Sequence, residues 1–473
     1  MVSSPRIANN LIIRNSVAID TNTPPPGIAS HGAGIYCRLS YATITGNTIT
    51  ENEVLDDFDG SGGGIFLAYS MPVIEGNRIT LNHAEQGAAI FSQTLSAPQI
   101  LGNLIQSNTM YAALPFYQGS ASGAITVQQA PDFRIEGNTL ADNTAAVGAA
   151  LNLSGCRAGR VQNNVITGNR AYDPTAFGGM AGGIYLMVLS DAVEPIYVVH
   201  NTIVGNVASN IFGEQGGGIA FALPAGSDRL VIANNLIVSN SSGLYQTPTP
   251  LPPDGRATLA YNNVFNLRSN YLNLAPGTGD FSVAPGWVDA ANGDFRLAPD
   301  SSCIDRGSAA YTVRVDAVGT PRPLDGDNDG TAAPDVGAFE VVHPLADSDH
   351  DGMTDVWEIE VLLDPTRDDA ALDPDADGAV NFDEWIAGTQ PRDARSVLRL
   401  TIPRGVGDAV RLRWLSVEGR TYRVEYRDKL LDTSGWQMLE GERVGTGGEL
   451  VAEDRLPSAS GRFYRLSVSR SRL

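Results

Sequence analysis

The chain has 473 residues and a formal net charge of −21, and 42% of its residues are hydrophobic. An acidic surface argues against nucleic acid as a partner, because phosphates need a basic surface. No run of residues approaches the roughly 18 to 20 apolar residues of a membrane-spanning helix. The composition therefore predicts about two to four domains with a sizeable core and no membrane span.

From its first residues the chain repeats the phrase Asn-x-(Leu/Ile)-x-x-Asn, and a Gly-rich strand start such as GGGIF (residues 62–66) stands between copies. Asn263 opens a ninth copy that lacks its second asparagine. The eight complete copies carry the pairs Asn10/Asn15, Asn47/Asn52, Asn77/Asn82, Asn103/Asn108, Asn138/Asn143, Asn164/Asn169, Asn201/Asn206 and Asn235/Asn240.

Each repeat unit is interpreted as three short strands joined by two asparagine turns and one longer loop. Such units bury their apolar side only by stacking on their neighbours. The expected fold is therefore mostly β, a right-handed parallel β-helix of about nine rungs, with adjacent strands roughly 4.8 Å apart. Equivalent asparagines are expected to stack into ladders, and asparagine tolerates the left-handed backbone of a tight turn. A leucine-rich repeat is the rival, but its period of about 20 to 29 residues carries more leucine and less asparagine.

The repeats end in a tail that contains GDFRLAPDSSCIDRG (293–307) and GTPRPLDGDNDGTAAPDVGAFE (319–340). Together with the repeats, this tail resembles bacterial right-handed β-helix proteins of the choice-of-anchor Q type. The resemblance implies an exported surface protein and fixes no reaction. We interpret residues 1–342 as one domain whose tail caps the open end of the β-helix. The residues that carry the resemblance are Cys303, Ile304, Asp305, Gly307, Arg322, Pro323, Asp335, Gly337, Ala338 and Glu340.

Two acidic phrases, DSDHDGMTDVWE (347–358) and DPDADGAVNFDE (373–384), carry the strongest chemical signal in the chain. Calcium takes about six to eight oxygen ligands, and in an EF-hand loop they stand at positions 1, 3, 5, 7, 9 and 12 around a glycine at position 6. The main-chain carbonyl serves at position 7. The predicted Ca²⁺ ligands are Asp347, Asp349, Asp351, Met353, Asp355 and Glu358 in the first loop, and Asp373, Asp375, Asp377, Ala379, Asn381 and Glu384 in the second.

Residues 343–392 form the predicted EF-hand-like calcium module, with 14 acidic residues against two arginines. Helices are expected after each loop, at 356–363 and 382–387. No helix is expected before the first loop, so the module resembles thrombospondin type 3 or dockerin-like repeats. A dockerin implies a cohesin partner, for which the sequence has no specific signal. The related phrase DGDNDG (325–330) lacks a glutamate at position 12.

Residues 393–473 alternate apolar and charged side chains in five segments, which is typical of strands buried on one face. Five such strands predict a small β-sandwich. Its aromatic residues, such as Trp414 and Tyr422, are interpreted as core rather than as a platform for sugars. The five segments are 397–402, 409–416, 420–428, 436–444 and 461–469.

Function follows less directly than fold. The first hypothesis is an exported or cell-surface, calcium-stabilised β-helix protein that binds glycans or mediates adhesion, because calcium outside cells is abundant enough for loose sites of this kind. The alternative is a polysaccharide lyase or hydrolase acting on the side of the β-helix. Its candidate catalytic residues are Asp56, Asp57, Asp59 and Arg78, although the three acids also suit a solvated loop. Whether the protein is an enzyme stays open at this stage.

Three further observations bear on these hypotheses. Glu75 and Glu136 are predicted to lie two rungs apart, about 9.6 Å, which is at or beyond the upper end for an inverting carboxylate pair. His83 and His200 flank ladder asparagines and are interpreted as turn residues. The N-terminus has no basic segment followed by an apolar one, so Met1 is interpreted as an internal start or a truncation.

Overall fold

A computed structural model describes the protein, which folds as two compact units, Met1–His343 and Pro344–Leu473. Among the described residues, no helix is long and apolar enough to span a membrane. The division into three domains stays a prediction, since the calcium module and the C-terminal strands fall in the same unit. The residues described are 3–18, 30–55, 60–110, 122–172, 179–188, 192, 194–209, 215–224, 226–248, 256–403, 409–429, 435–455 and 461–470.

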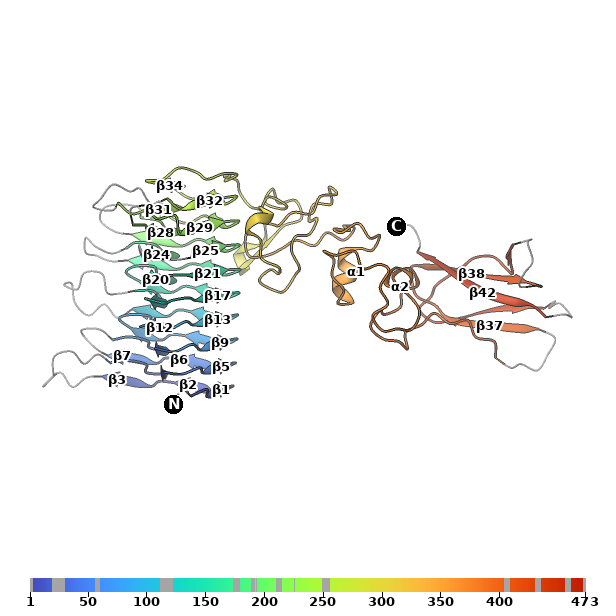
Figure 1. The fold of residues 1–473 in the computed structure, drawn as a ribbon, viewed down its shortest axis with the longest axis horizontal. Coiled ribbons are helices and arrows are strands. Elements are labelled where there is room, and N and C mark those ends of the chain that lie inside the picture. The colour runs from blue at the N-terminus through green and yellow to red at the C-terminus, as the bar shows by residue number, and fades with distance from the viewer. Residues whose placement is uncertain are drawn as a thin grey trace. The chain divides into compact units, whose positions relative to one another are not determined.

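Unit 1 is a right-handed parallel β-helix whose rungs stack into four parallel sheets (Figure 1). The first sheet contains β1 (Arg6–Ala8), β5 (Thr43–Thr45), β9 (Val73–Glu75), β13 (Gln99–Leu101), β17 (Arg134–Glu136), β21 (Gly159–Gln162), β25 (Ile196–Val199), β29 (Leu230–Ala233) and β32 (Thr258–Ala260). The second contains β2 (Leu11–Ile13), β6 (Thr48–Thr50), β10 (Arg78–Thr80), β14 (Leu104–Gln106), β18 (Thr139–Ala141), β22 (Val165–Thr167), β26 (Thr202–Val204), β30 (Leu236–Val238) and β33 (Asn263–Phe265).

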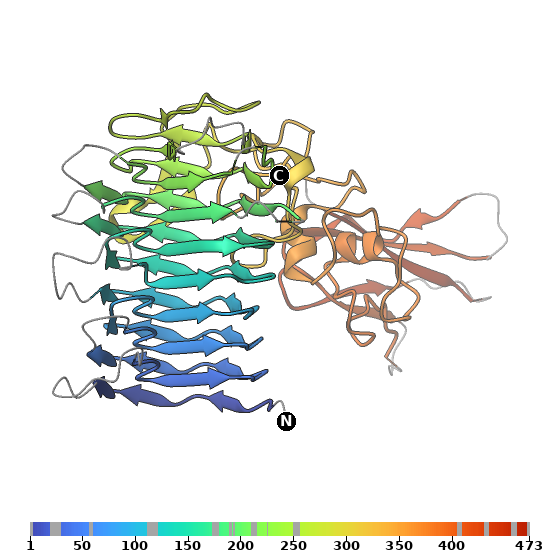
Figure 2. The same cartoon turned by 60° about the vertical axis from the view of Figure 1, so that its left-hand side comes forward.

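The third and fourth sheets complete each rung. The third contains β3 (Ser16–Ala18), β7 (Glu53–Leu55), β11 (His83–Ala84), β15 (Thr109–Met110), β19 (Thr144–Ala145), β23 (Arg170–Tyr172) and β27 (Val207–Ser209). The fourth contains β4 (Ile35–Arg38), β8 (Ile65–Ala68), β12 (Ile90–Gln93), β16 (Ile125–Gln128), β20 (Leu151–Cys156), β24 (Ile184–Val188), β28 (Ile219–Ala222), β31 (Leu244–Gln246) and β34 (Tyr271–Leu272). Figure 2 shows the strands stacked one above another from the N-terminus.

The structure confirms the β-helix and corrects the number of strands in a rung. Three strands were expected, whereas most rungs have four. The additional strand is the two- or three-residue segment that follows the second asparagine, such as β11. It is too short to give a period-two pattern in the sequence, and the variable loop separates it from the Gly-rich strand of the same rung.

Aliphatic side chains fill the interior of the β-helix in columns that run from rung to rung. Ile44, Ile74, Ile100 and Ile135 occupy the same register position in successive strands of the first sheet. Each of these side chains is fully buried. Burial of one such side chain stabilises the fold by about 1.5–3 kcal/mol. The hydrophobic core therefore forms through the stacking of rungs.

The predicted asparagine ladders are present at two corners of the rungs. In the first ladder the Oδ1 atom of Asn77 accepts hydrogen bonds from both the main-chain N and the Nδ2 atom of Asn47, each at 2.9 Å. Asn77 repeats this arrangement with Asn103, and its Nδ2 atom also donates to the carbonyl of Ile44 at 2.8 Å. Each asparagine thereby forms hydrogen bonds with buried polar groups of the adjacent turns. Leaving such groups without a partner costs free energy.

Two details of the ladders differ from the prediction. The left-handed backbone falls on the residue before each asparagine of the eight complete pairs, such as Gly46 (φ 64°) and His200 (φ 53°), and not on the asparagine itself. The ninth copy opens at Asn262 rather than Asn263, and Asn266 supplies the second asparagine that the pattern lacked. The four-residue spacing between Asn262 and Asn266 explains why the repeat phrase missed this pair.

The tail lies along the flank of the β-helix, beside the later rungs (Figure 1). The cap prediction is therefore wrong for its main part, because Phe295 and Ala338 pack against Val165, Val204 and Val238 on the outer side of the second sheet. Apolar residues on that outward face are what the tail covers. Its elements are β35 (Trp287–Asp289), the 3₁₀ helix η1 (Ala290–Asn292), β36 (Asp294–Leu297) and the 3₁₀ helix η2 (Ala309–Tyr311).

A buried polar network holds the tail together. The Arg322 and Glu340 side chains form a 2.8 Å ion pair, with 0% and 1% of their side-chain surfaces exposed. Arg322 also donates to Asn163 Oδ1 in the β-helix at 3.2 Å, and Glu340 accepts from the main-chain N of Asp335 at 2.9 Å. Arg322, Asp335 and Glu340 thus have a structural role in this network.

Unit 2 contains the two acidic loops and a set of antiparallel strands. The helices α1 (Asp355–Glu360) and α2 (Asn381–Ala387) follow the loops, as predicted, and begin within one residue of their expected starts. Arg470 lies 3.9 Å above the ring of Trp385, so the second loop region packs on the strands. The strands are β37 (Val410–Leu415), β38 (Arg420–Arg427), β39 (Gln437–Met438), β40 (Arg443–Val444), β41 (Glu449–Asp454) and β42 (Phe463–Arg470).

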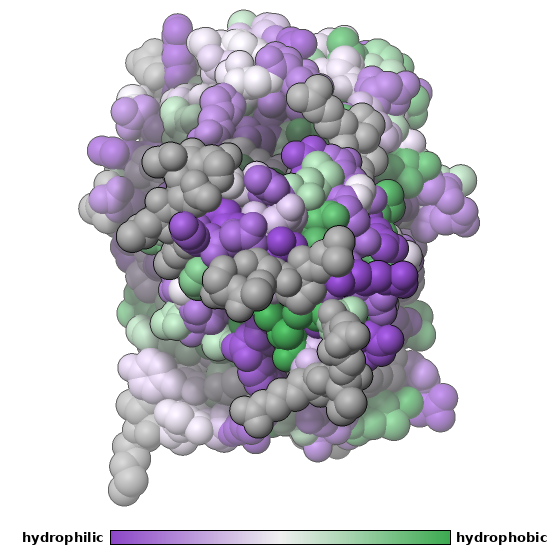
Figure 3. Space-filling view, turned by 90° about the vertical axis from the view of Figure 1, so that its right-hand side faces the viewer, coloured by the Kyte–Doolittle hydropathy of each residue, from purple (hydrophilic) through white to green (hydrophobic). Residues whose placement is uncertain are grey.

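The strands of unit 2 form two small antiparallel sheets around a shared core. One sheet pairs β37 with β41, and the other places β38 between β42 and the short strands β39 and β40. The buried Trp414 and Tyr422 contribute to this core, as the sequence predicted. Residues 397–402 form only a single bridge, Thr401 to Arg413, while β41 was not predicted. On the face drawn in Figure 3, hydrophilic residues are interspersed with small groups of hydrophobic ones.

Candidate metal centre

The acidic loops 347–358 and 373–384 share one local geometry. In each, the carboxylate at position 1 accepts a hydrogen bond from the glycine N–H at position 6, at 2.9 Å in the first loop and 3.0 Å in the second. The two glycines, Gly352 and Gly378, have φ of 93° and 99°. Glycine adopts this backbone without steric penalty. The turn gathers the aspartates at positions 1, 3 and 5 on the inside of each loop.

The gathered carboxylates present oxygens that no protein group satisfies. In each loop, one oxygen from each of the three aspartates lies within 4.8 Å of the other two. Glu358, at position 12 of the first loop, is fully buried, and neither of its side-chain oxygens has a hydrogen-bond partner. Buried polar atoms without a partner are costly. The other such oxygens in the two loops are Asp349 Oδ2, Asp373 Oδ1, Asp375 Oδ2, Asp377 Oδ2, Asn381 Oδ1, and Glu384 Oε1 and Oε2.

Burial and mutual repulsion raise the pKa values of these carboxyl groups. Burial, followed by the charges of Asp349 and Asp351, raises the pKa of Glu358 to about 9. Burial and the charge of Asp351 raise the pKa of Asp349 to about 7. In the second loop, burial raises the pKa of Glu384 to about 7, and the Thr389 side chain partly offsets it. A nearby cation stabilises the charged form of each group, so the residues fit a hard, oxygen-seeking cation such as Ca²⁺.

The structure separates one predicted ligand from this centre and adds another residue. Asp355, at position 9, accepts hydrogen bonds from the main-chain N and the hydroxyl of Ser348, at 2.8 and 2.6 Å. Asp369, 11 residues beyond Glu358, instead places an oxygen within 4.8 Å of oxygens of Asp351 and Glu358. Sequence reasoning missed Asp369 because it lies outside both loop patterns, and only its place in an acid-rich linker marked it.

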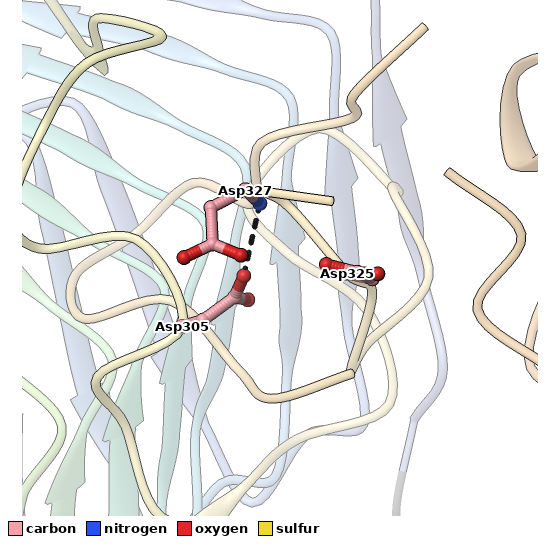
Figure 4. Close-up of side chains that lie close together, drawn as sticks. All are labelled: Asp305, Asp325 and Asp327. Carbon is pink, nitrogen blue, oxygen red and sulfur yellow. Dashed lines mark hydrogen bonds between the residues drawn. The ribbon is translucent and has the colours of Figure 1, made fainter. Parts of the chain in front are cut away.

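A third acidic group lies in the tail of unit 1. The phrase at 325–330 brings Asp325 and Asp327 to Asp305, and the main-chain N of Asp327 donates to Asp305 Oδ2 at 3.0 Å (Figure 4). Burial raises the pKa of Asp305 to about 7. This phrase has no glutamate at position 12. An aspartate from an earlier turn of the tail, Asp305, joins the group instead.

The part of the chain that the structure describes does not bring the candidate catalytic residues together. Asp56, Asp57 and Asp59 lie outside the described residues. Arg78 is exposed on β10, and its register neighbours in the second sheet are Thr48 and Leu104. In the described part of the second sheet, neither of these two neighbours of Arg78 therefore carries a carboxylate.

The other titratable residues that the sequence singled out lie at structural positions in the β-helix. Glu75 and Glu136 lie two rungs apart with Leu101 between them, as predicted, and Glu136 forms an ion pair with Arg134. His200 is fully buried and its Nε2 atom lies 2.9 Å from the side-chain N of Asn234. The interpretation as a turn residue is confirmed for His200 and is wrong for His83, which lies on β11.

The comparison with protein-family models agrees with the fold. A family model described as "Right handed beta helix region" matches residues 33–249. A solved structure titled "Crystal structure of pectate lyase Pel9A" aligns over 70% of this chain and 87% of its own, with 13% sequence identity and a TM-score of 0.35. A search of curated proteins finds no match. Fold and family model together define a right-handed parallel β-helix protein.

Proposed function

We propose that this protein is an exported or cell-surface β-helix protein that binds calcium in unit 2 and uses unit 1 to bind glycans or to mediate adhesion. The observation that carries the calcium part is Glu358, a fully buried carboxylate whose two oxygens have no hydrogen-bond partner. Burying an unpaired carboxylate is unfavourable. A Ca²⁺ ion at the loop would supply the missing charge, and the Glu358 carboxylate would be one of the groups that hold it.

The calcium is structural in this proposal. In the first loop, the oxygens of Asp347, Asp349, Asp351 and Glu358 converge, and the loop pattern adds the Met353 carbonyl. The second loop contributes Asp373, Asp375, Asp377, Asn381 and Glu384 together with the Ala379 carbonyl. The buried apolar residues at these loops are few, namely Met353, Val361 and Leu363 with the half-buried Trp357 and Trp385 packed against them. Bound ions therefore contribute much of the local stability.

The proposed location outside the cell rests on the same loops. Sites of this type bind calcium in the range of about 10⁻⁴–10⁻³ M in extracellular modules, and calcium outside cells reaches that range. The resemblance of the tail to the choice-of-anchor Q type, and of the loops to thrombospondin type 3 or dockerin-like repeats, supports the same proposal.

An aromatic surface on unit 1 supports glycan binding. Leu39, Tyr41, Tyr69 and Met71 follow the first two strands of the fourth sheet, with 52%, 49%, 46% and 48% of their surfaces exposed. Leu39 N donates to Ala68 O at 3.1 Å, which places Leu39 and Tyr69 on adjacent rungs. Tyrosine offers an apolar ring face and a polar tip, and this combination suits the mixed surface of a sugar ring.

Affinity electrophoresis against a panel of acidic and neutral polysaccharides tests the glycan proposal. A binding polysaccharide retards the wild-type protein, and Tyr41→Ala with Tyr69→Ala lowers its affinity by about tenfold, in keeping with the loss of two aromatic contacts. Tyr172→Ala is the matched control, because Tyr172 is 46% exposed on β23 of the third sheet. Unretarded migration with every polysaccharide argues against glycan binding.

For the alternative function, a polysaccharide lyase or hydrolase, the candidate among the described residues is Arg78, an exposed cation on the side of the β-helix. Incubation of the same panel with the protein, followed by detection of reducing ends and unsaturated products, tests it. Product formation that disappears in Arg78→Ala and Asp57→Ala supports this site. Product formation that survives both substitutions excludes the site, and no product at all leaves glycan binding as the function.

A further inference from the structure

The aspartate at position 9 of the first loop is engaged elsewhere. Asp355 is fully buried, and its two oxygens accept hydrogen bonds from the main-chain N and the hydroxyl of Ser348. Each Asp355 oxygen thus accepts one short hydrogen bond from Ser348, and a metal ion at position 9 would compete with that donor for the oxygen. Position 9 of the first loop therefore lacks the ligand that the sequence pattern assigns to it.

Asp369 lies beside the carboxylates of the first loop. It is 8% exposed, and one of its oxygens lies within 4.8 Å of oxygens of Asp351 and Glu358. The main-chain N of Asp369 also donates to Asp351 Oδ2 at 3.3 Å, so the backbone holds the residue beside the first loop. The buried Glu358 belongs to the same group of carboxylates, and neither of its two oxygens has a hydrogen-bond partner.

Asp369 is joined to the second loop as well. The Nδ2 atom of Asn381, at position 9 of that loop, donates to Asp369 Oδ1 at 2.8 Å and to the Asp369 carbonyl at 2.9 Å. The other side-chain atom of Asn381, Oδ1, is buried and has no hydrogen-bond partner. A single amide group thus holds Asp369 with its nitrogen and offers its oxygen to the second loop.

We propose that Asp369, in place of Asp355, completes the first calcium site and that its hydrogen bonds with Asn381 couple the first site to the second. This inference rests on the proposed calcium binding. An ion in the first site fixes Asp369 and with it Asn381, which presents its oxygen to the second ion in a fixed orientation. Coupling of this kind is reciprocal, so each ion raises the affinity for the other.

Calorimetric titration of the full chain with Ca²⁺ tests the assignment of Asp369. The wild type is expected to take up two ions at these loops with a Hill coefficient above one. Asp369→Asn removes one charged ligand and lowers the affinity of the first site by about tenfold or more, since ligand charge tunes the affinity of such sites. Asp368→Asn is the matched control, because Asp368 is exposed and adjacent in sequence. An Asp369→Asn protein that titrates like Asp368→Asn overturns the assignment.

The coupling is tested by Asn381→Asp, which keeps an oxygen at position 9 and removes the Nδ2 donor. This variant is expected to bind two ions independently, with a Hill coefficient of one. Cooperative binding that persists in Asn381→Asp, or independent binding by the wild type, overturns the coupling while calcium binding itself stands. A wild-type chain that takes up no Ca²⁺ at these loops refutes the proposed function and this inference together.

Discussion

The asparagine ladders show how one side chain type fixes the shape of each corner. The spacing of the asparagines predicted the ladders, because any fold that stacks the repeat brings equivalent residues together. Which residue takes the left-handed backbone was not predictable from asparagine preference alone, since Gly46, Glu51 and Leu81 all adopt it. That position is set by the chain path at the corner, which imposes the conformation on whatever residue stands there.

Asn103→Ala is expected to destabilise unit 1 by about 3 kcal/mol or more, because it removes the acceptor of two Asn77 donors and the donor to the Ile74 carbonyl. Asn10→Ala is the matched control at the same corner of the first rung. Asn10 is exposed and donates to Asn47, and its loss is expected to cost less than about 1 kcal/mol. Urea unfolding followed by circular dichroism measures both, and equal effects contradict the ladder account.

His200 provides a pH-dependent contribution to stability. Burial, and then the charge of Arg322, lower the pKa of His200 well below its ordinary value. The unfolded chain therefore binds a proton that the folded chain resists, and stability falls as the pH drops below about 6.5. Asn163 and Asn234 hold the same corner in the adjacent rungs with φ of 57° and 55°, so His200→Asn suits this backbone.

Between pH 7 and pH 5 the wild type is expected to lose up to about 2 kcal/mol more of its unfolding free energy than His200→Asn loses. Urea unfolding of both proteins at the two pH values gives this difference. A variant that shows the same pH dependence as the wild type contradicts the assignment to His200.

At the scale of elements, the tail is the part that sequence placed least well. The sequence of the tail does not say which surface of the β-helix the segment covers. The sequence contains a hint in Val165, Val204 and Val238, which stand at outward positions of the second sheet where β6 and β10 have only Thr and Arg. These apolar residues need a cover, and Phe295 and Ala338 supply it.

Arg322→Met is expected to destabilise the tail by about 3–5 kcal/mol, because it leaves the buried Glu340 carboxylate without its partner. Arg296→Met is the matched control, since Arg296 pairs with Asp294 at 2.6 Å but is 61% exposed. That surface pair contributes about 0–1 kcal/mol. Limited proteolysis should cut the tail of Arg322→Met first and leave Arg296→Met as resistant as the wild type. Equal resistance of the two variants excludes the proposed role of the buried pair.

At the scale of the whole molecule, different interactions stabilise the two units. Unit 1 is stabilised by aliphatic columns and asparagine ladders, which need no ion. The loops of unit 2 gather carboxylates whose pKa values are raised by burial and repulsion, such as Glu358 at about 9. The sequence predicted the loops because ligand spacing is local. It could not predict that Asp369 lies beside Asp351 and Glu358, because that depends on how the linker between the loops folds back.

Differential scanning calorimetry of the full chain, with excess Ca²⁺ and with a chelator, tests the central claim most directly. Calcium at a hundredfold excess over Kd stabilises unit 2 by about 2.7 kcal/mol per ion, which raises its melting temperature on the order of 10 °C per ion. The account predicts a smaller transition that moves with calcium and a larger one, from unit 1, that stays in place. Two transitions that are both indifferent to calcium would contradict it.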